Sequence, residues 1–322
     1  MAILDKVRNY MESRIILTGA ELDIFTLIHR KISTADEIAQ KLNADKRGTA
    51  RLLDALTVFG ILEKKDFKYS IKPEFFTLSS DHPESVLPMV LHMNDLWDSW
   101  TYLTEAVIEG KNPGKTDFPD DFEKNTRSFI GAMHVAGKNL SLKIASSLDL
   151  SEFKKLLDIG GASGTYTIAF LEKNPLMKSI VFDLPQVIDF SKKGIEAAGL
   201  SDRVEFETGD YNFSELPKGC DLALLSAIIH QNSPKENLEL FRKIYNAIKP
   251  GGMLVIRDHI MDSTRTKPAL GSVFAINMLV ATNGGDTYTF EEVKNFLEKS
   301  GFKDVLFELQ GENMDCLVTC RK

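Results

Sequence analysis

A histidine and a carboxylate each stand at the end of an apolar run. The segment LLSAIIH ends at His230 and reads as a strand buried on both faces, and the segment LVIRD ends at Asp258. Because the carboxyl ends of neighbouring parallel strands lie at one edge of a sheet, we expect these side chains to meet. A neutral imidazole can accept a proton from a reacting hydroxyl, and a carboxylate can fix its tautomer. The pattern predicts a general base and its partner, unless His230 merely caps the next helix.

A glycine turn follows another apolar run, in the segment LLDIGGASGTYTIAF. Gly160, Gly161 and Gly164 would let the backbone approach a ligand at the start of a helix. The spacing differs from the G-x-G-x-x-G of dinucleotide sites, which disfavours a nicotinamide oxidoreductase. Asp158 beside the turn disfavours a pyrophosphate and favours a ligand with an ammonium group, such as S-adenosylmethionine. The alternative is a purely structural turn in which Asp158 is a helix cap.

Two more strand-like segments end in acids. Asp183 ends SIVFD, where a carboxylate could accept hydrogen bonds from both ribose hydroxyls of a nucleoside. Asp210 follows VEFETG and could accept a bond from an adenine amino group, with Tyr211 packed on the ring. Any one of these acids alone could be a solvated loop residue. Together they predict a nucleoside site at the carboxyl edge of the sheet.

The elements that must carry these residues divide the chain into two patterns. Residues 1–80 predict three helices and a hairpin, a winged-helix arrangement, with a capping box at Thr34 and Glu37 and a helix end at Gly60. From Leu156 onward, short apolar strands alternate with helices, which predicts an α/β fold with a Rossmann-like parallel sheet and an antiparallel C-terminal hairpin. We expect a domain at 1–100 and a second at 101–322, in which 101–150 form connecting helices.

Composition narrows the classes of function. The 322 residues carry a net charge of −7, which argues against a general nucleic-acid or membrane surface. Three cysteines are too few for a disulfide framework, and the histidines show no metal-ligand spacing, so we expect no metal. The N-terminus lacks the apolar core of a signal peptide, and no run approaches the length of a membrane span. We expect a cytoplasmic protein.

These motifs together resemble class I S-adenosylmethionine-dependent methyltransferases. The segments DIGGASG, VFDLPQVI, GDYN and SAIIHQNSP resemble those of the small-molecule O-methyltransferases related to the caffeic acid, acetylserotonin and bacterial polyketide enzymes, over nearly the whole chain. The resemblance implies S-adenosyl-L-methionine as cofactor, with Leu184 and Ser226 near it, and a homodimer formed by the winged helix. It implies that His230 is the general base and that Asp258 occupies a position that holds an acid. It also implies a small-molecule acceptor.

Two departures leave the acceptor open. Gln231 and Thr287 stand where the family usually has acids, which allows a more acidic oxygen, a carbon or a nitrogen as the methylated atom. A winged helix also allows a ligand-sensing DNA-binding regulator, although residues 31–72 are only modestly basic. We expect the acceptor pocket to use the helix before the sheet and the segment after the fifth strand, although core packing is an alternative for each residue; the candidates are Phe129, Met133, His134, Asn277 and Met278.

Overall fold

The computed structural model describes residues 2–114 and 122–322. The chain forms two compact units. The first runs to Trp97 and includes the early part of a later helix, as far as Val135, and the second comprises the rest. This division differs from the expected boundary at residue 100, because that later helix is shared between the units. Each unit is described by itself.

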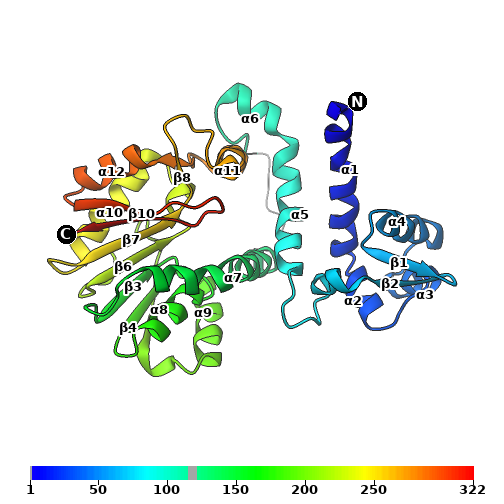
Figure 1. Ribbon diagram of the computed structural model, residues 1–322, viewed down its shortest axis with the longest axis horizontal. Coiled ribbons are helices and arrows are strands. Elements are labelled where there is room, and N and C mark those ends of the chain that lie inside the picture. Colours follow the sequence, from blue (N-terminus) through cyan, green and yellow to red (C-terminus); the bar gives the residue numbers. More distant parts are fainter. Residues whose placement is uncertain (1, 115–121) are drawn as a thin grey trace. The chain divides into compact units, whose positions relative to one another are not determined.

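The first unit contains the predicted helices and hairpin (Figure 1). Thr34 and Glu37 form the predicted capping box, and Gly60 follows the last helix with a φ of 79°. Within residues 18–30, Asp23 adopts a left-handed conformation that separates two helices. The elements are α1 (Ala2–Glu21), α2 (Ile24–His29), α3 (Ala35–Leu42), α4 (Lys46–Val58), β1 (Leu62–Lys65) and β2 (Lys68–Ile71).

Further helices connect the hairpin to the sheet. They are η1 (Pro73–Leu78), α5 (Leu87–Thr101), α6 (Leu103–Glu109) and α7 (Phe122–Ser147). Helices α6 and α7 lie within the connecting region expected at 101–150, and residues 115–121 between them lie outside the described residues. None of the described helices is long and apolar enough to cross a membrane.

The second unit is built on a seven-stranded sheet of order β10-β11-β7-β6-β3-β4-β5. The strands from β7 to β5 in this order are parallel, whereas β11 is antiparallel to both β7 and β10, as the sequence predicts. The strands are β3 (Lys155–Ile159), β4 (Lys178–Asp183), β5 (Val204–Thr208), β6 (Leu222–Ser226), β7 (Met253–Asp258), β10 (Lys303–Leu309) and β11 (Cys316–Arg321). This is the predicted Rossmann-like sheet with a C-terminal hairpin.

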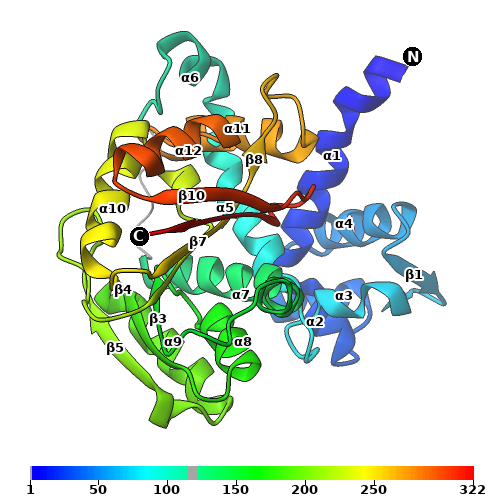
Figure 2. The ribbon, with the colours of Figure 1, turned by 60° about the vertical axis from the view of Figure 1, so that its left-hand side comes forward.

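Helices cover both faces of this sheet (Figures 1 and 2). One apolar core lies against α10 and α12, and a second lies against α8, α9 and the end of α7. The remaining elements are α8 (Thr165–Lys173), α9 (Pro185–Ala197), η2 (Ser201–Arg203), η3 (Ile229–Gln231), α10 (Pro234–Ala247), β8 (Ile260–Met261), α11 (Ala269–Ala281), β9 (Tyr288–Thr289) and α12 (Phe290–Lys299). Burial on both faces explains why the central strands β3, β4, β6 and β7 are almost continuously apolar, whereas the edge strands β5 and β10 are partly exposed.

Candidate active site

The parallel strands bring the predicted polar residues to one edge of the sheet. Asp183 ends β4, Ser226 ends β6 and Asp258 ends β7, while Asp158 is the penultimate residue of β3. Asp210 lies two residues beyond the end of β5. Since the five strands run in the same direction, all of these residues lie at their carboxyl ends, where ligands of such sheets bind.

The histidine does not end the strand as the sequence suggests. Strand β6 stops at Ser226, and Ala227 turns the chain with a φ of 60° while its N–H bonds the carbonyl of Arg257 at 2.8 Å. His230 then lies in the short 3-10 turn η3. The prediction of a continuous strand that reaches His230 is therefore wrong, because the left-handed conformation of Ala227 ends the strand earlier. The turn still delivers the imidazole to the end of β7.

His230 and Asp258 form a buried pair. Nδ1 of His230 lies 2.8 Å from Oδ1 and 2.9 Å from Oδ2 of Asp258, and the two residues are 6 % and 0 % exposed. Burial favours the neutral acid, but the positive charge that His230 carries when protonated, its hydrogen bond and the charge of Arg257 outweigh burial and hold the pKa of Asp258 below its usual value. An ionised carboxylate can only accept, so Nδ1 carries the proton of a neutral ring. Nε2 is then the nitrogen that can take a proton.

A phenylalanine that the sequence reading missed packs against this pair. The ring of Phe274, on α11, lies edge-on to the His230 ring, with centroids 4.9 Å apart and an interplanar angle of 87°. It also lies 5.2 Å from the ring of His259, whose pKa burial lowers to about 4. His259 is therefore neutral, and its Nδ1 is buried without a hydrogen-bond partner among the described residues. Its position about one helical turn before Asn277 and Met278 is the one hint in the sequence, and it does not separate Phe274 from a core residue.

The glycine turn has no room for side chains at two positions. Gly160 has a φ of +70°, and a Cβ there would lie 2.6 Å from Cδ1 of Ile228. A Cβ at Gly161 would lie 2.8 Å from Val181. Gly164 is the left-handed residue before α8. Glycine at these positions avoids contacts with Ile228 and Val181 and permits the positive φ values of Gly160 and Gly164, which keeps the turn tight against the sheet.

Asp183 holds this turn in place. Its Oδ2 accepts a hydrogen bond from the N–H of Ala162 at 2.8 Å, and its Oδ1 accepts one from the N–H of Leu184 at 2.7 Å. Burial raises the pKa of the Asp183 carboxyl despite these bonds. Each carboxylate oxygen has further lone pairs, so two hydroxyl donors can still be accommodated. Asp183 and Leu184 therefore lie against the glycine turn, as a shared cofactor site requires.

Asp158 lies deeper than the sequence suggests. It is 1 % exposed, and its Oδ2 accepts a hydrogen bond from Thr167 Oγ1 at 2.6 Å. Burial, aided by the charge of Asp183, raises the pKa of Asp158 to about 6. Its carboxylate can act on a cationic ligand through its field, and it is poised to change charge close to neutral pH.

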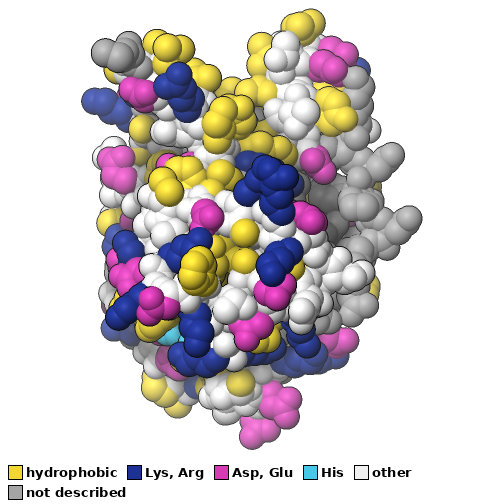
Figure 3. Space-filling view, turned by 90° about the vertical axis from the view of Figure 1, so that its right-hand side faces the viewer, with side chains coloured by type: hydrophobic (Ala, Val, Ile, Leu, Met, Phe, Trp, Pro, Cys, Tyr) yellow, Lys and Arg dark blue, Asp and Glu magenta, His cyan; other side chains and the backbone are white. Residues whose placement is uncertain are grey.

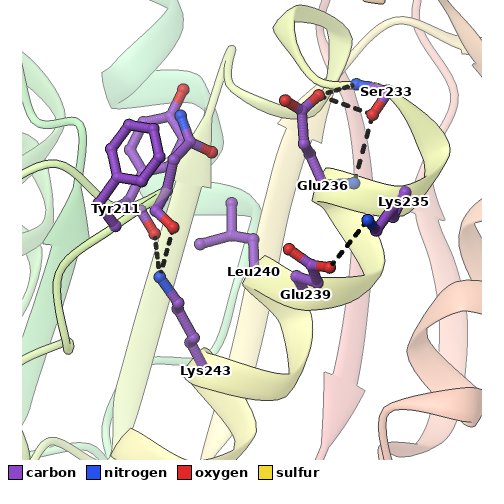
Figure 4. Close-up of a pocket in the computed structure, with 9 residues that line it drawn as sticks. Tyr211, Ser233, Lys235, Glu236, Glu239, Leu240 and Lys243 are labelled. Atoms are coloured by element: carbon purple, nitrogen blue, oxygen red, sulfur yellow. Dashed lines mark hydrogen bonds and ion pairs between the residues drawn. The ribbon is translucent and has the colours of Figure 1, made fainter.

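Asp210 and Tyr211 begin a loop that is held by hydrogen bonds, including those donated by a lysine of α10. Asp210 Oδ1 accepts the N–H of Asn212 at 2.8 Å, and Lys243 donates to the carbonyls of Tyr211 and Asn212 at 2.9 and 2.7 Å. Figure 4 shows Lys243 reaching this loop from α10, beside a pocket of about 310 Å³. The pocket does not include His230, so it belongs to the Tyr211 loop and not to the acid–base pair.

The predicted acceptor-pocket residues belong to different units. Phe129, on α7, packs edge-on against His92 within the first unit, where Met133 is half-buried and His134 is exposed. In the second unit, Asn277 on α11 accepts a hydrogen bond from Trp100 Nε1 at 2.9 Å. Met278 is 5 % exposed and therefore packs into the core of its own unit. That all five residues line one acceptor pocket stays a prediction.

The two departures from the expected acids leave the pair with a single carboxylate. Gln231 Nε2 bonds the carbonyl of Ala227 at 3.0 Å, and Thr287 Oγ1 bonds the carbonyl of Gly271 at 3.3 Å. Neither side chain bonds His230. Within the part of the chain that the structure describes, Asp258 is the one carboxylate in hydrogen-bond contact with this imidazole.

Comparisons with known proteins show the family to which the chain belongs. Residues 100–303 match the O-methyltransferase domain family, and residues 4–80 match the O-methyltransferase dimerisation domain. The chain is 28 % identical over 310 residues to the tetracenomycin polyketide synthesis 8-O-methyl transferase TcmO of Streptomyces glaucescens, covering 94 % of this chain and 91 % of that protein. It is 26 % identical over 331 residues to the acetylserotonin O-methyltransferase of Gallus gallus, covering 96 % and 94 %.

A solved structure shows the same fold. The crystal structure of human N-acetylserotonin methyltransferase in complex with SAM matches with a TM-score of 0.85 at 24 % identity, covering 100 % of this chain and 96 % of that one. The winged helix therefore accompanies an enzyme domain. This combination argues against a DNA-binding regulator. The chain belongs to the S-adenosylmethionine-dependent O-methyltransferases.

Proposed function

We propose that this enzyme methylates a hydroxyl oxygen of a small aromatic molecule and that His230 is its general base. The observation that carries the proposal is the buried His230–Asp258 pair at the carboxyl edge of the sheet, with Nδ1 held at 2.8 Å from Oδ1. The names of two relatives of this chain refer to tetracenomycin polyketide synthesis and to acetylserotonin. Both suggest an aromatic acceptor.

The residues at the edge fit S-adenosylmethionine. The tight glycine turn brings backbone N–H groups to the start of α8, and Asp183, Asp210 and Ser226 provide polar groups around it. We assign the cofactor to this turn, with Asp183 and Leu184 at the ribose and Asp210 and Tyr211 at the adenine. When bound, the cofactor supplies an electrophilic methyl group on a sulfonium sulfur.

The chain's own contribution is to control one proton. An aromatic hydroxyl has a pKa of about 10, so little of it is ionised at neutral pH. Neutral His230 accepts the hydroxyl proton at Nε2, and its ring becomes cationic. The ionised Asp258 stabilises that cation and holds the ring in place, as in other histidine–carboxylate pairs.

The test is a screen of phenolic acceptors with isotopically labelled cofactor, read by mass spectrometry. We expect a labelled methyl ether on at least one aromatic hydroxyl and binding of S-adenosylhomocysteine by calorimetry. Labelled products carrying the methyl group only on carbon or nitrogen would contradict the proposed oxygen acceptor.

We also propose that residues 1–100 form a dimerisation domain, that residues 101–322 form the catalytic domain, and that the enzyme is a homodimer. The match of residues 4–80 to the O-methyltransferase dimerisation domain supports this proposal. Exposed apolar side chains on α1 support it as well, because such side chains are usually covered by a partner.

A further inference from the structure

A buried arginine lies beside the acid–base pair without a carboxylate partner. Arg257 precedes Asp258 on β7 and is 8 % exposed. Its Nε and Nη2 donate to Ser226 Oγ at 3.0 and 2.9 Å, and its Nη1 donates to the carbonyl of Met314 at 3.0 Å. All of these acceptors are neutral. Across residues 2–114 and 122–322, no carboxylate forms an ion pair with Arg257, and Asp258 is already engaged by His230.

A second buried group near this arginine lacks a partner. The guanidinium carbon lies 5.1 Å from the centre of the Tyr166 ring, a cation–π contact. Tyr166, the second residue of α8, is 8 % exposed, and its hydroxyl forms no hydrogen bond of normal geometry with the described residues. Burial raises the pKa of this hydroxyl, and the charge of Arg257 and the nearby Ser226 hydroxyl, which lies outside hydrogen-bond geometry, only partly oppose that rise. Because a buried charge without a counter-charge and a buried hydroxyl without a hydrogen bond are both costly, the two groups together indicate a binding site for an anionic group.

The surrounding charges indicate what kind of anion fits. Ser226 pairs with Arg257, and Leu224 pairs with Asp158, so Asp158 and Arg257 project from one face of the sheet on either side of β6. The guanidinium donates to Ser226 on β6, the one strand that lies between β7 and the strand of Asp158. A negative and a positive group at this separation are complementary to the ammonium and carboxylate of one amino-acid end.

We propose that Arg257 and Tyr166 bind the carboxylate of the methionine portion of S-adenosylmethionine. The inference deepens the proposed function and rests on it. Three of the five N–H groups of the guanidinium are used by Ser226 and Met314, so one on each Nη remains for the carboxylate. The Tyr166 hydroxyl supplies a third donor. Asp158, on the neighbouring strand, faces the ammonium group.

Calorimetry with two ligands tests this assignment. One ligand is S-adenosylhomocysteine and the other is its decarboxylated analogue, which keeps the adenosine, the thioether and the amine. We expect Arg257→Gln to weaken S-adenosylhomocysteine binding by roughly 10- to 100-fold, which is the usual effect of losing hydrogen bonds to a charged group. Binding of the decarboxylated analogue should be unaffected. Tyr166→Phe keeps the ring beneath the guanidinium and should show the same selectivity with a smaller loss.

Arg321→Gln is the matched control. Arg321 also lies over an aromatic ring, at 5.2 Å from the centre of Phe153, but it is paired with Glu152 and lies on β11. The Arg321→Gln variant should bind S-adenosylhomocysteine and the decarboxylated analogue as tightly as the wild type does. If Arg257→Gln does not fold, as judged by circular dichroism, Tyr166→Phe and Arg257→Lys provide the same comparison.

Three outcomes would overturn the assignment. Equal weakening of both ligands would mean that Arg257 is structural. Unchanged binding of S-adenosylhomocysteine, with a raised KM for the acceptor, would assign the anion site to the acceptor. Wild-type protein that binds the two ligands equally well would show that the carboxylate has no site, although the nucleoside site would stand. Failure of the wild type to bind either ligand would instead refute the proposed function itself.

Discussion

At the scale of single residues, the orientation of the His230 imidazole is fixed by two contacts. Asp258 fixes one ring nitrogen and Phe274 packs edge-on against the ring, so the remaining nitrogen has little freedom. We predict that His230→Ala lowers turnover by roughly 10²- to 10⁴-fold, the usual effect of losing a general base. Affinity for S-adenosylhomocysteine should be unchanged. Asp258→Asn should cost less, because the imidazole remains.

The acidity of the acceptor separates base catalysis from packing. An acceptor that is already ionised needs no base, so the defect of His230→Ala should shrink as the pKa of the acceptor hydroxyl falls. Steady-state kinetics over a series of substituted phenols measures this trend. His29→Ala removes an exposed histidine of the first unit and serves as the control. A defect of equal size across the series would assign His230 to shaping the site.

A second prediction at this scale concerns Asp158, whose pKa is raised to about 6 by burial. A carboxyl with a raised pKa binds its proton more tightly in the folded protein, so its contribution to stability grows as the pH falls through about 6. Ligand binding has the opposite dependence, because protonation removes the negative charge facing the ligand's ammonium group. We expect the affinity for S-adenosylhomocysteine to fall as the pH drops below about 6.

Calorimetry over a pH series, in buffers that differ in ionisation enthalpy, would detect the coupled proton release. Asp158→Asn should bind more weakly at neutral pH and should flatten the dependence. Thr167→Val is a useful comparison, since it removes the hydrogen bond to Asp158 Oδ2 without removing the charge. A wild-type affinity that stays constant across this range would contradict the prediction.

At the scale of elements, the glycine turn and the histidine turn contact each other. A Cβ at Gly160 would lie 2.6 Å from Ile228, two residues before His230. We predict that Gly160→Ala destabilises the protein by about 2–3 kcal/mol and weakens cofactor binding, because it combines a strained φ with a clash. Gly199→Ala is the matched control, with a φ of +69° and open space around the Cβ.

Gly199→Ala should cost only about 1 kcal/mol and leave binding intact. Chemical denaturation and calorimetry on both variants distinguish strain from contact. Equal losses of stability in the two variants would mean that the clash with Ile228 is relieved without cost.

The elements also show why part of the site was predictable and part was not. Strand ends were readable because the apolar runs stop at Asp158, Asp183 and Asp258, and Ser233 with Glu236 forms the capping box that begins α10. The turn at Ala227 was not readable, because alanine rarely adopts a left-handed conformation and only tertiary contacts impose it here.

Contacts between distant segments were equally hidden. Phe274 meets His230 from a helix more than 40 residues away, and nothing in the local pattern of α11 distinguishes it from core. Arg257 reads as part of a buried strand, and its unpaired charge becomes evident only when Ser226 and Tyr166 are placed around it. Local patterns predicted which strands reach the edge, but side-chain partners depended on the packing of the whole unit.

At the scale of the whole molecule, the question is what covers the apolar surface of the first unit. Figure 3 shows hydrophobic side chains among charged ones on the face that this unit presents. Helix α1 is the main source, with Ile3, Leu4, Val7, Tyr10 and Met11 between 49 % and 67 % exposed. So many apolar side chains on one helix of a monomer would be a liability in water. A second copy of the chain, joined in a symmetric homodimer, is the partner that we propose.

We therefore predict that the wild type is a dimer at micromolar concentration and that the double variant Leu4→Glu/Val7→Glu is a folded monomer. Two buried charges facing their symmetry mates would be desolvated in the dimer, whereas in the monomer they lie in water. Light scattering measures the mass, and circular dichroism confirms the fold. Leu176→Glu, at a residue 79 % exposed in the second unit, should remain a dimer. A wild type that is monomeric, or a double variant that stays dimeric, would place the partner surface elsewhere than on α1.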